Sequence, residues 1–156
     1  MIEVEVEDPA WTAEVPDADA LVRAAATAAL AAVGIDPAPL TILLTDDAVV
    51  QDLNGQFRGQ ASPTNVLSFP AALNPEGHLG DIAIAFETCR REAQAQAKPL
   101  SHHLQHLTVH GVLHLLGHDH IGDDEAEVME DLERAVLAGL GLPDPYADGD
   151  GDHERP

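Results

Sequence analysis

Cysteine, aromatic residues and long apolar runs are all scarce in this sequence of 156 residues. The single cysteine, Cys89, excludes a disulfide within the chain and is typical of a reducing compartment. No apolar run reaches the roughly 18 residues that a membrane span needs. The N-terminal segment Met1–Glu7 has neither the basic flank nor the apolar core of a secretory signal. These absences predict a cytoplasmic protein without a membrane partner.

Positive charge is also scarce. The chain holds seven Lys and Arg against 28 Asp and Glu, a formal net charge of −21. Such a surface repels a phosphate backbone, which argues against a general nucleic-acid binder, and no DNA partner is expected. The charge is uneven, because residues 53–120 hold five acidic and four basic residues together with eight of the nine histidines. An anionic substrate would therefore have to bind through this middle segment.

The length is that of one ordinary domain, and hydrophobic periodicity predicts an α+β fold over residues 1–146. The expected strands cover 2–7, 40–44, 66–69 and 82–86, and the expected helices cover 18–33, 46–54, 88–97, 102–116 and 123–140. This order predicts a small mixed sheet of four strands packed with about five helices. Residues 58–64 have the composition of a loop, which would contain Arg58. Residues 147–156 are acidic and Gly-rich, and are predicted to be a disordered tail.

The strongest chemical signal is a set of three histidines. His110 and His114 are four residues apart in a predicted helix, so both can face one metal ion. Gly117 can end that helix in a left-handed conformation, and the returning loop can bring His120 to the same ion. Three neutral imidazoles leave a fourth tetrahedral position for water, the arrangement of a catalytic zinc site with one Zn²⁺ per chain. The alternatives are a merely solvated or packed helix, or a closed structural site with His118 as fourth ligand.

The residue after the first of these histidines bears on the reaction. The spacing His-x-x-x-His-x-x-Gly-x-x-His is also that of metzincin proteases, in which Glu follows the first His and acts as general base. Here that position is Gly111, which has no side chain to carry a proton. The sequence therefore keeps the metal scaffold of a metalloprotease and lacks its base, which counts against proteolysis.

The earlier part of the same helix holds three more histidines at helical spacing, His102, His103 and His106. They could form a solvated face or a face that contacts phosphate. Because an exposed histidine face is the simpler reading of such a pattern, we predict that these three side chains are solvated.

Two longer stretches give the chain a family resemblance. His110–His120, read His-Gly-Val-Leu-His-Leu-Leu-Gly-His-Asp-His, resembles the signature of the YbeY-type rRNA maturation endoribonucleases. Pro63–Pro70 resembles the family's Pro-Thr-Asp-Val-Leu-Ser-Phe-Pro stretch, with Asn65 in place of the usual Asp. His118 stands where Tyr is common. Further similar segments are Phe57-Arg58, Gly80–Ile82, Glu125–Glu130 and Leu140–Tyr146, so the resemblance covers roughly residues 1–146.

The resemblance implies a function and a partner. It implies a zinc-dependent, single-strand-specific endoribonuclease that matures the 3′ end of 16S rRNA, takes part in ribosome quality control and works with the small ribosomal subunit. The family's functional arginine corresponds to Arg58, whose planar guanidinium suits a phosphate. An ordinary surface arginine is the alternative. The nucleophile stays open between the 2′-hydroxyl of the RNA and a zinc-bound water.

Two functions from other classes remain as alternatives. One is a metzincin-like metalloprotease, and the other is a non-catalytic, zinc-stabilised module associated with the ribosome.

Overall fold

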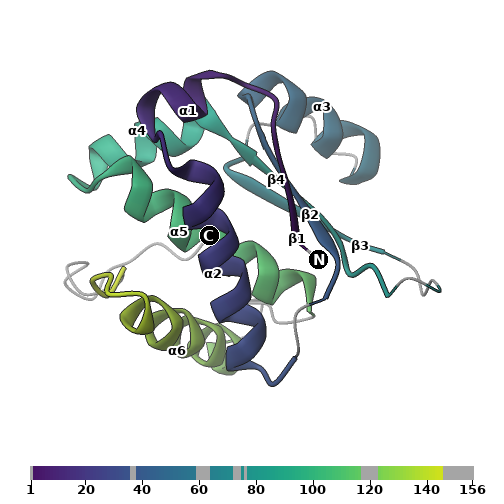
Figure 1. Cartoon of the computed structure of the whole chain (residues 1–156), viewed down its shortest axis with the longest axis vertical. Helices are drawn as coiled ribbons and strands as arrows, with labels where there is room; N and C mark the ends of the chain where they lie inside the picture. The colour runs from purple at the N-terminus through teal and green to yellow at the C-terminus, as the bar shows by residue number, and fades with distance from the viewer. Residues whose placement is uncertain are drawn as a thin grey trace.

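The architecture is that of a computed structural model of the chain. It describes residues 2–35, 38–58, 64–71, 75, 77–116 and 123–145, and for residues 57, 58 and 123–126 it describes the backbone alone. The elements in chain order are β1 (Ile2–Val6), α1 (Ala10–Glu14), α2 (Ala18–Ala32), β2 (Leu40–Thr45), α3 (Asp47–Arg58), β3 (Val66–Pro70), β4 (Gly80–Ala85), α4 (Phe86–Ala95), α5 (Leu100–Leu115) and α6 (Asp123–Gly139) (Figure 1). The predicted α+β class is confirmed.

The four strands form one mixed sheet in the order β1-β2-β4-β3. β1 and β4 both run parallel to β2, whereas β3 is antiparallel to β4. In the register, Ile42 of the central strand β2 lies between Val4 and Ile82. A strand with neighbours on both sides and helices on both faces needs apolar residues throughout, which explains the nearly continuous apolar run of β2.

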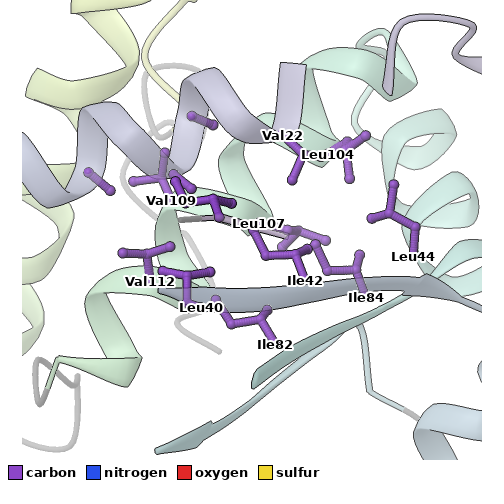
Figure 2. Close-up of a cluster of buried hydrophobic side chains, with 14 of the residues drawn as sticks. Val22, Leu40, Ile42, Leu44, Ile82, Ile84, Leu104, Leu107, Val109 and Val112 are labelled. Carbon is purple, nitrogen blue, oxygen red and sulfur yellow. The ribbon is translucent and has the colours of Figure 1, made fainter. Parts of the chain in front are cut away.

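Helices cover the two faces of the sheet unequally. On one face α5 and α2 pack against each other and against the strands, with α4 and α6 beside α5. Figure 2 shows the core between them, where Ile42, Ile82 and Ile84 of the strands meet Leu107 and other side chains of α5. The other face carries α3, which covers a smaller cluster of Val50, Leu67, Ala83 and Ala85. The central helix of the larger core is therefore α5, the helix that carries the histidines.

The short helix α1 is an addition to the five predicted helices. Its five residues are too few to show a helical period. Asp8, which precedes the N-cap residue Pro9, accepts a hydrogen bond at Oδ1 from the N–H of Ala10 at 2.9 Å. Trp11 is fully buried, donates from Nε1 to the carbonyl of Thr45 at 3.0 Å, and packs edge-on against Phe86. Helix α1 therefore closes the core where β2 and β4 end.

Helix α3 is longer than predicted, and this changes the setting of Arg58. The pair Asn54-Gly55 is typical of a helix end, yet α3 continues to Arg58. A glycine inside a helix costs only about 1 kcal/mol, and tertiary contacts offset that cost: Asn54 is buried and Leu53 packs against the smaller cluster. The prediction that Arg58 lies in a loop is therefore wrong, because it is the last residue of a helix.

The other predicted elements begin and end within two residues of the observed helices and strands. None of the described helices is long and apolar enough to cross a membrane. The segment 147–156 lies outside the described residues, so its assignment as a disordered tail stays a prediction.

Candidate metal centre

The two helical histidines of the predicted metal site lie together on α5. The ring centroids of His110 and His114 are 6.2 Å apart and their planes differ by 7°, so the imidazoles stack one helical turn apart. The predicted third ligand, His120, lies outside the described residues, as do Gly117 and His118. Within the described ranges no group of three or more His, Cys, Asp or Glu side chains is arranged to hold a metal ion. The described part of the chain thus supplies two of the three predicted ligands.

Gly111, the residue directly after the first of these histidines, faces the sheet. A Cβ atom added to Gly111 would lie 3.0 Å from Cγ2 of Ile82 and 3.3 Å from Cγ2 of Val66. Ser68 on β3 also donates its hydroxyl to the carbonyl oxygen of Gly111 at 2.8 Å. A glutamate at position 111 would therefore run into the sheet. The close packing of α5 against β3 and β4 therefore leaves little room at position 111 for the base of a metzincin protease.

We expect Gly111→Ala to destabilise the fold by about 1–2 kcal/mol. Alanine gains about 0.5–1 kcal/mol over glycine in a helix interior, but overpacking a core costs about 1–3 kcal/mol, and the buried Ile82 has little room to move. Gly139 on α6 is the matched control, because a Cβ there meets nothing within 4 Å. Gly139→Ala should therefore be neutral or stabilising. Urea unfolding of both variants tests this, and a Gly111→Ala variant as stable as the parent would contradict the close packing.

A buried carboxylate on α6 contacts the first of the predicted ligands. Glu133 is fully buried, and its Oε2 lies 2.7 Å from Nδ1 of His110 while its Oε1 lies 2.7 Å from Nε2 of His106. Burial by itself would raise the pKa of Glu133, but the hydrogen bonds from the two imidazoles outweigh it and hold the pKa well below its usual range. With an imidazole nitrogen 2.7 Å from each of its oxygens, Glu133 is placed to accept a hydrogen bond from both rings.

This arrangement fits a zinc ion. Since His110 donates from Nδ1 to Glu133, its basic nitrogen is Nε2, the atom that would bind the metal. A ligand histidine whose other ring nitrogen donates to a carboxylate is the usual second-layer arrangement of zinc sites. Imidazole nitrogens are also ligands that zinc prefers. The chemistry of His110 and His114 would thus suit zinc, and the ligand set of His110, His114 and His120 stays a prediction.

Two of the three histidines predicted to form a solvated face, His103 and His106, are instead largely buried, while His102 is half-buried. The side chain of His106 is 12% exposed, and His103 as a residue is 3% exposed. Nε2 of His103 lies 2.8 Å from Oε1 of Glu92 on α4, and Asn65 donates to the same oxygen at 3.0 Å. Burial opposes ionisation of Glu92, but the hydrogen bonds from His103 and Asn65 outweigh it and lower its pKa. An aspartate at position 65 would instead repel Glu92, so Asn65 suits this partner.

We expect the His103–Glu92 pair to make the fold sensitive to acid. The pKa of His103 lies below 6.5 chiefly because burial disfavours its charged form; Glu92 opposes this, and Lys98 and His106 add to it. Unfolded His103 takes up a proton near pH 6.5, whereas folded His103 does so at a lower pH, so stability falls as pH drops below about 6.5. Glu92, with its lowered pKa, loses its contribution only below about pH 4.5.

The variant His103→Gln tests this, because its amide can still donate to Glu92 but does not titrate. Urea unfolding between pH 7.5 and 5, with a chelator present throughout, should show a shallower loss of stability, by up to about 1.4 kcal/mol per pH unit. Equal slopes for parent and variant would show that His103 is not the acid-sensitive group.

Comparison with known proteins decides the family. A sequence model of the family described as "Endoribonuclease YbeY" matches residues 4–141. The chain belongs to this family. A relative named Endoribonuclease YbeY from Bradyrhizobium diazoefficiens is 52% identical over 98% of this chain and 88% of its own length. One from Azorhizobium caulinodans is 54% identical over 94% and 96%.

A further relative of the same name, from Rhodopseudomonas palustris (strain BisB18), is 57% identical over 90% of this chain and 88% of its own length. A Thermotoga maritima protein solved in solution matches 99% of this chain and 100% of its own with a TM-score of 0.55, at 21% identity. At that identity the likeness shows the fold alone. The YbeY resemblance seen in the sequence is confirmed.

The arginine that the YbeY resemblance singles out, Arg58, is the last residue of α3, whose apolar side chains pack on the face of the sheet opposite α5. The N-terminus of α3 is fixed to α4 by two contacts: Asp47 accepts hydrogen bonds from the N–H and hydroxyl of Thr88, and Glu87 accepts one from the N–H of Asp47. From Arg58 the chain runs through residues 59–63, outside the described part, to Asn65 and β3. The structure fixes the backbone of Arg58, and its role stays a prediction.

Glu133 is the site residue that the sequence analysis missed. It lies on the apolar stripe of α6, in line with Met129, Val136 and Leu137, all of which are buried. These positions have the i, i+4, i+7, i+8 spacing of a core face. A glutamate on such a stripe needs a buried partner, and this signal was available in the sequence.

Proposed function

We propose that this chain is a zinc-dependent endoribonuclease that cuts single-stranded RNA. One zinc ion per chain is held by His110, His114 and His120. The enzyme acts in the cytoplasm on rRNA associated with the small ribosomal subunit, in maturation of the 16S 3′ end and in ribosome quality control. The observation that carries the proposal is the pair of stacked imidazoles, with His110 in contact with the buried Glu133, in a chain matched by the YbeY family model over residues 4–141.

The residues of the site have different roles in this reaction. The three histidines hold the ion, which when bound supplies Lewis-acid polarisation of a phosphoryl oxygen. Arg58 contacts the phosphate and stabilises the charge that develops on it. Gly111 contributes no base, because it has no side chain, and Ile82 and Val66 lie where a side chain would begin. An RNA substrate needs a protein base less than a peptide does, since it carries its own 2′-hydroxyl nucleophile.

The negative charge of the chain is compatible with an RNA substrate only if a few groups at the site, and not the surface as a whole, bind the RNA. Of the basic residues, Arg90 lies 3.6 Å from Glu14, and Arg91 lies 3.9 Å from Asp47. Arg134 contacts Asp131 at 2.8 Å. Guanidinium groups already close to carboxylates attract a phosphate backbone weakly. We therefore expect affinity to come chiefly from the metal, from Arg58 and from the ribosomal subunit.

Incubation of the purified chain with single-stranded RNA and with an unfolded protein, each with and without a chelator, tests the proposal. We expect RNA cleavage that the chelator stops and zinc restores, with the unfolded protein left intact. Chelator-sensitive cleavage of the protein alone would favour the metalloprotease. Loss of thermal stability in chelator without cleavage of either substrate would favour the non-catalytic zinc module.

A further inference from the structure

We propose that Glu133 and His106 are positioning residues that fix the ring orientation and the tautomer of His110. This inference rests on the proposed zinc site and names two residues behind it. They come from different helices, His106 from α5 and Glu133 from α6, and meet inside the protein.

The contacts link the side chains of His106, Glu133 and His110 in series. Glu133 accepts from Nδ1 of His110 through Oε2 and from Nε2 of His106 through Oε1, both at 2.7 Å. The Glu133 side chain is 1% exposed, while those of His110 and His106 are 15% and 12% exposed. Because its two oxygens contact the imidazoles inside the core, Glu133 acts on the substrate only through His110.

The chemistry of a carboxylate dictates the tautomers. An ionised carboxylate only accepts hydrogen bonds, so each imidazole must donate to it. His110 then carries its proton on Nδ1, and Nε2 keeps the lone pair that a metal ion needs. His106 anchors the second oxygen, so that the carboxylate cannot rotate away from His110. His106 therefore acts on the metal site indirectly, through Glu133 and His110.

The same contact joins the two helices that flank the segment holding His120. That segment, residues 117–122, connects the end of α5 to the start of α6. Glu133 joins α6 to α5 through His110, and Met129 one turn earlier packs into the core. Helices α5 and α6 are thereby held together beside His110.

The variant Glu133→Gln tests the positioning role with little change of shape. An amide offers one acceptor and one donor, so one of the two imidazoles must lose its hydrogen bond or change its tautomer. Long-range ¹H–¹⁵N NMR of the metal-free protein should show His110 as the Nδ1–H tautomer in the parent and as a mixture in the variant. Titration with Zn²⁺ against a chromophoric chelator should show affinity about 10–100-fold weaker. Glu127→Gln, an exposed position on the same helix, should match the parent in both.

Two substitutions of His106 separate positioning from simple packing. His106→Leu keeps an apolar group of similar bulk and removes the donor, and should weaken Zn²⁺ binding several-fold. His106→Gln places an amide nitrogen equally far along the side chain and should restore affinity to near that of the parent. The visible absorption bands of bound Co²⁺ should change with Leu and return with Gln.

The outcomes are distinguishable from those of the proposed function. A parent protein that binds no Zn²⁺ overturns the metal centre, while the tautomer of His110 in parent and Glu133→Gln still decides the positioning role. A parent that binds Zn²⁺, together with a Glu133→Gln variant of equal affinity and unchanged His110 tautomer, overturns the positioning role alone. If His106→Leu binds Zn²⁺ as tightly as the parent, His106 has no part in positioning His110.

Discussion

Replacing His114 by alanine should abolish stoichiometric zinc binding and RNA cleavage together. His114 supplies one of three predicted ligands, and its ring stacks on that of His110 at 6.2 Å. Loss of an outer-layer partner already costs about 10–100-fold in metal affinity, so loss of a ligand should cost at least about 100-fold. Zinc per chain after dialysis and cleavage of labelled single-stranded RNA measure the two effects.

A matched control shows that the effect belongs to the site. His102→Ala removes an imidazole from the first turn of the same helix, far from His110 along α5. This variant should keep one zinc per chain and the parental cleavage rate, and circular dichroism should show both variants folded. Full zinc occupancy in His114→Ala would remove His114 from the ligand set and with it the proposed metal centre.

The sequence predicts the sheet and the long helices because their signals are local. Each strand is a short apolar or alternating run, and each long helix has a continuous apolar stripe bounded by Asp, Gly or Pro. The same reasoning predicts the stacking of His110 on His114, since two residues four apart on a helix share a face whatever surrounds them. Nothing comparable marks α1, whose stability comes from the distant partners of Trp11, at Thr45 and Phe86.

Tertiary contacts explain the errors. His103 and His106 look like a solvated face because their partners, Glu92 and Glu133, lie 11 and 27 residues away on other helices. A histidine with an unseen carboxylate partner cannot be distinguished from an exposed one by spacing alone. The prediction of where α3 ends fails for a related reason. Contacts made by Leu53 outweigh the local preference of Asn54-Gly55 to stop a helix.

Arg58→Ala should keep zinc and fold while losing most RNA cleavage. A guanidinium is a cation and has no place among metal ligands, so metal content should be unchanged. A charge-assisted contact to a reacting phosphate contributes ~2 kcal/mol or more, which is a loss of roughly 30-fold or more in rate. Because the contact strengthens as charge develops on the phosphate, the loss should fall on kcat more than on KM.

Two further substitutions decide whether the effect is specific to Arg58. Arg58→Lys keeps the charge and loses the planar fork, so it should recover only part of the rate. Arg90→Ala removes a guanidinium that lies 3.6 Å from Glu14 and should leave cleavage within about twofold of the parent, since an exposed ion pair contributes little. Cleavage by Arg58→Ala within the same twofold range would show that this arginine is an ordinary surface residue. An equal loss in Arg58→Ala and Arg90→Ala would point instead to general attraction of RNA by positive charge, which higher salt would weaken in both.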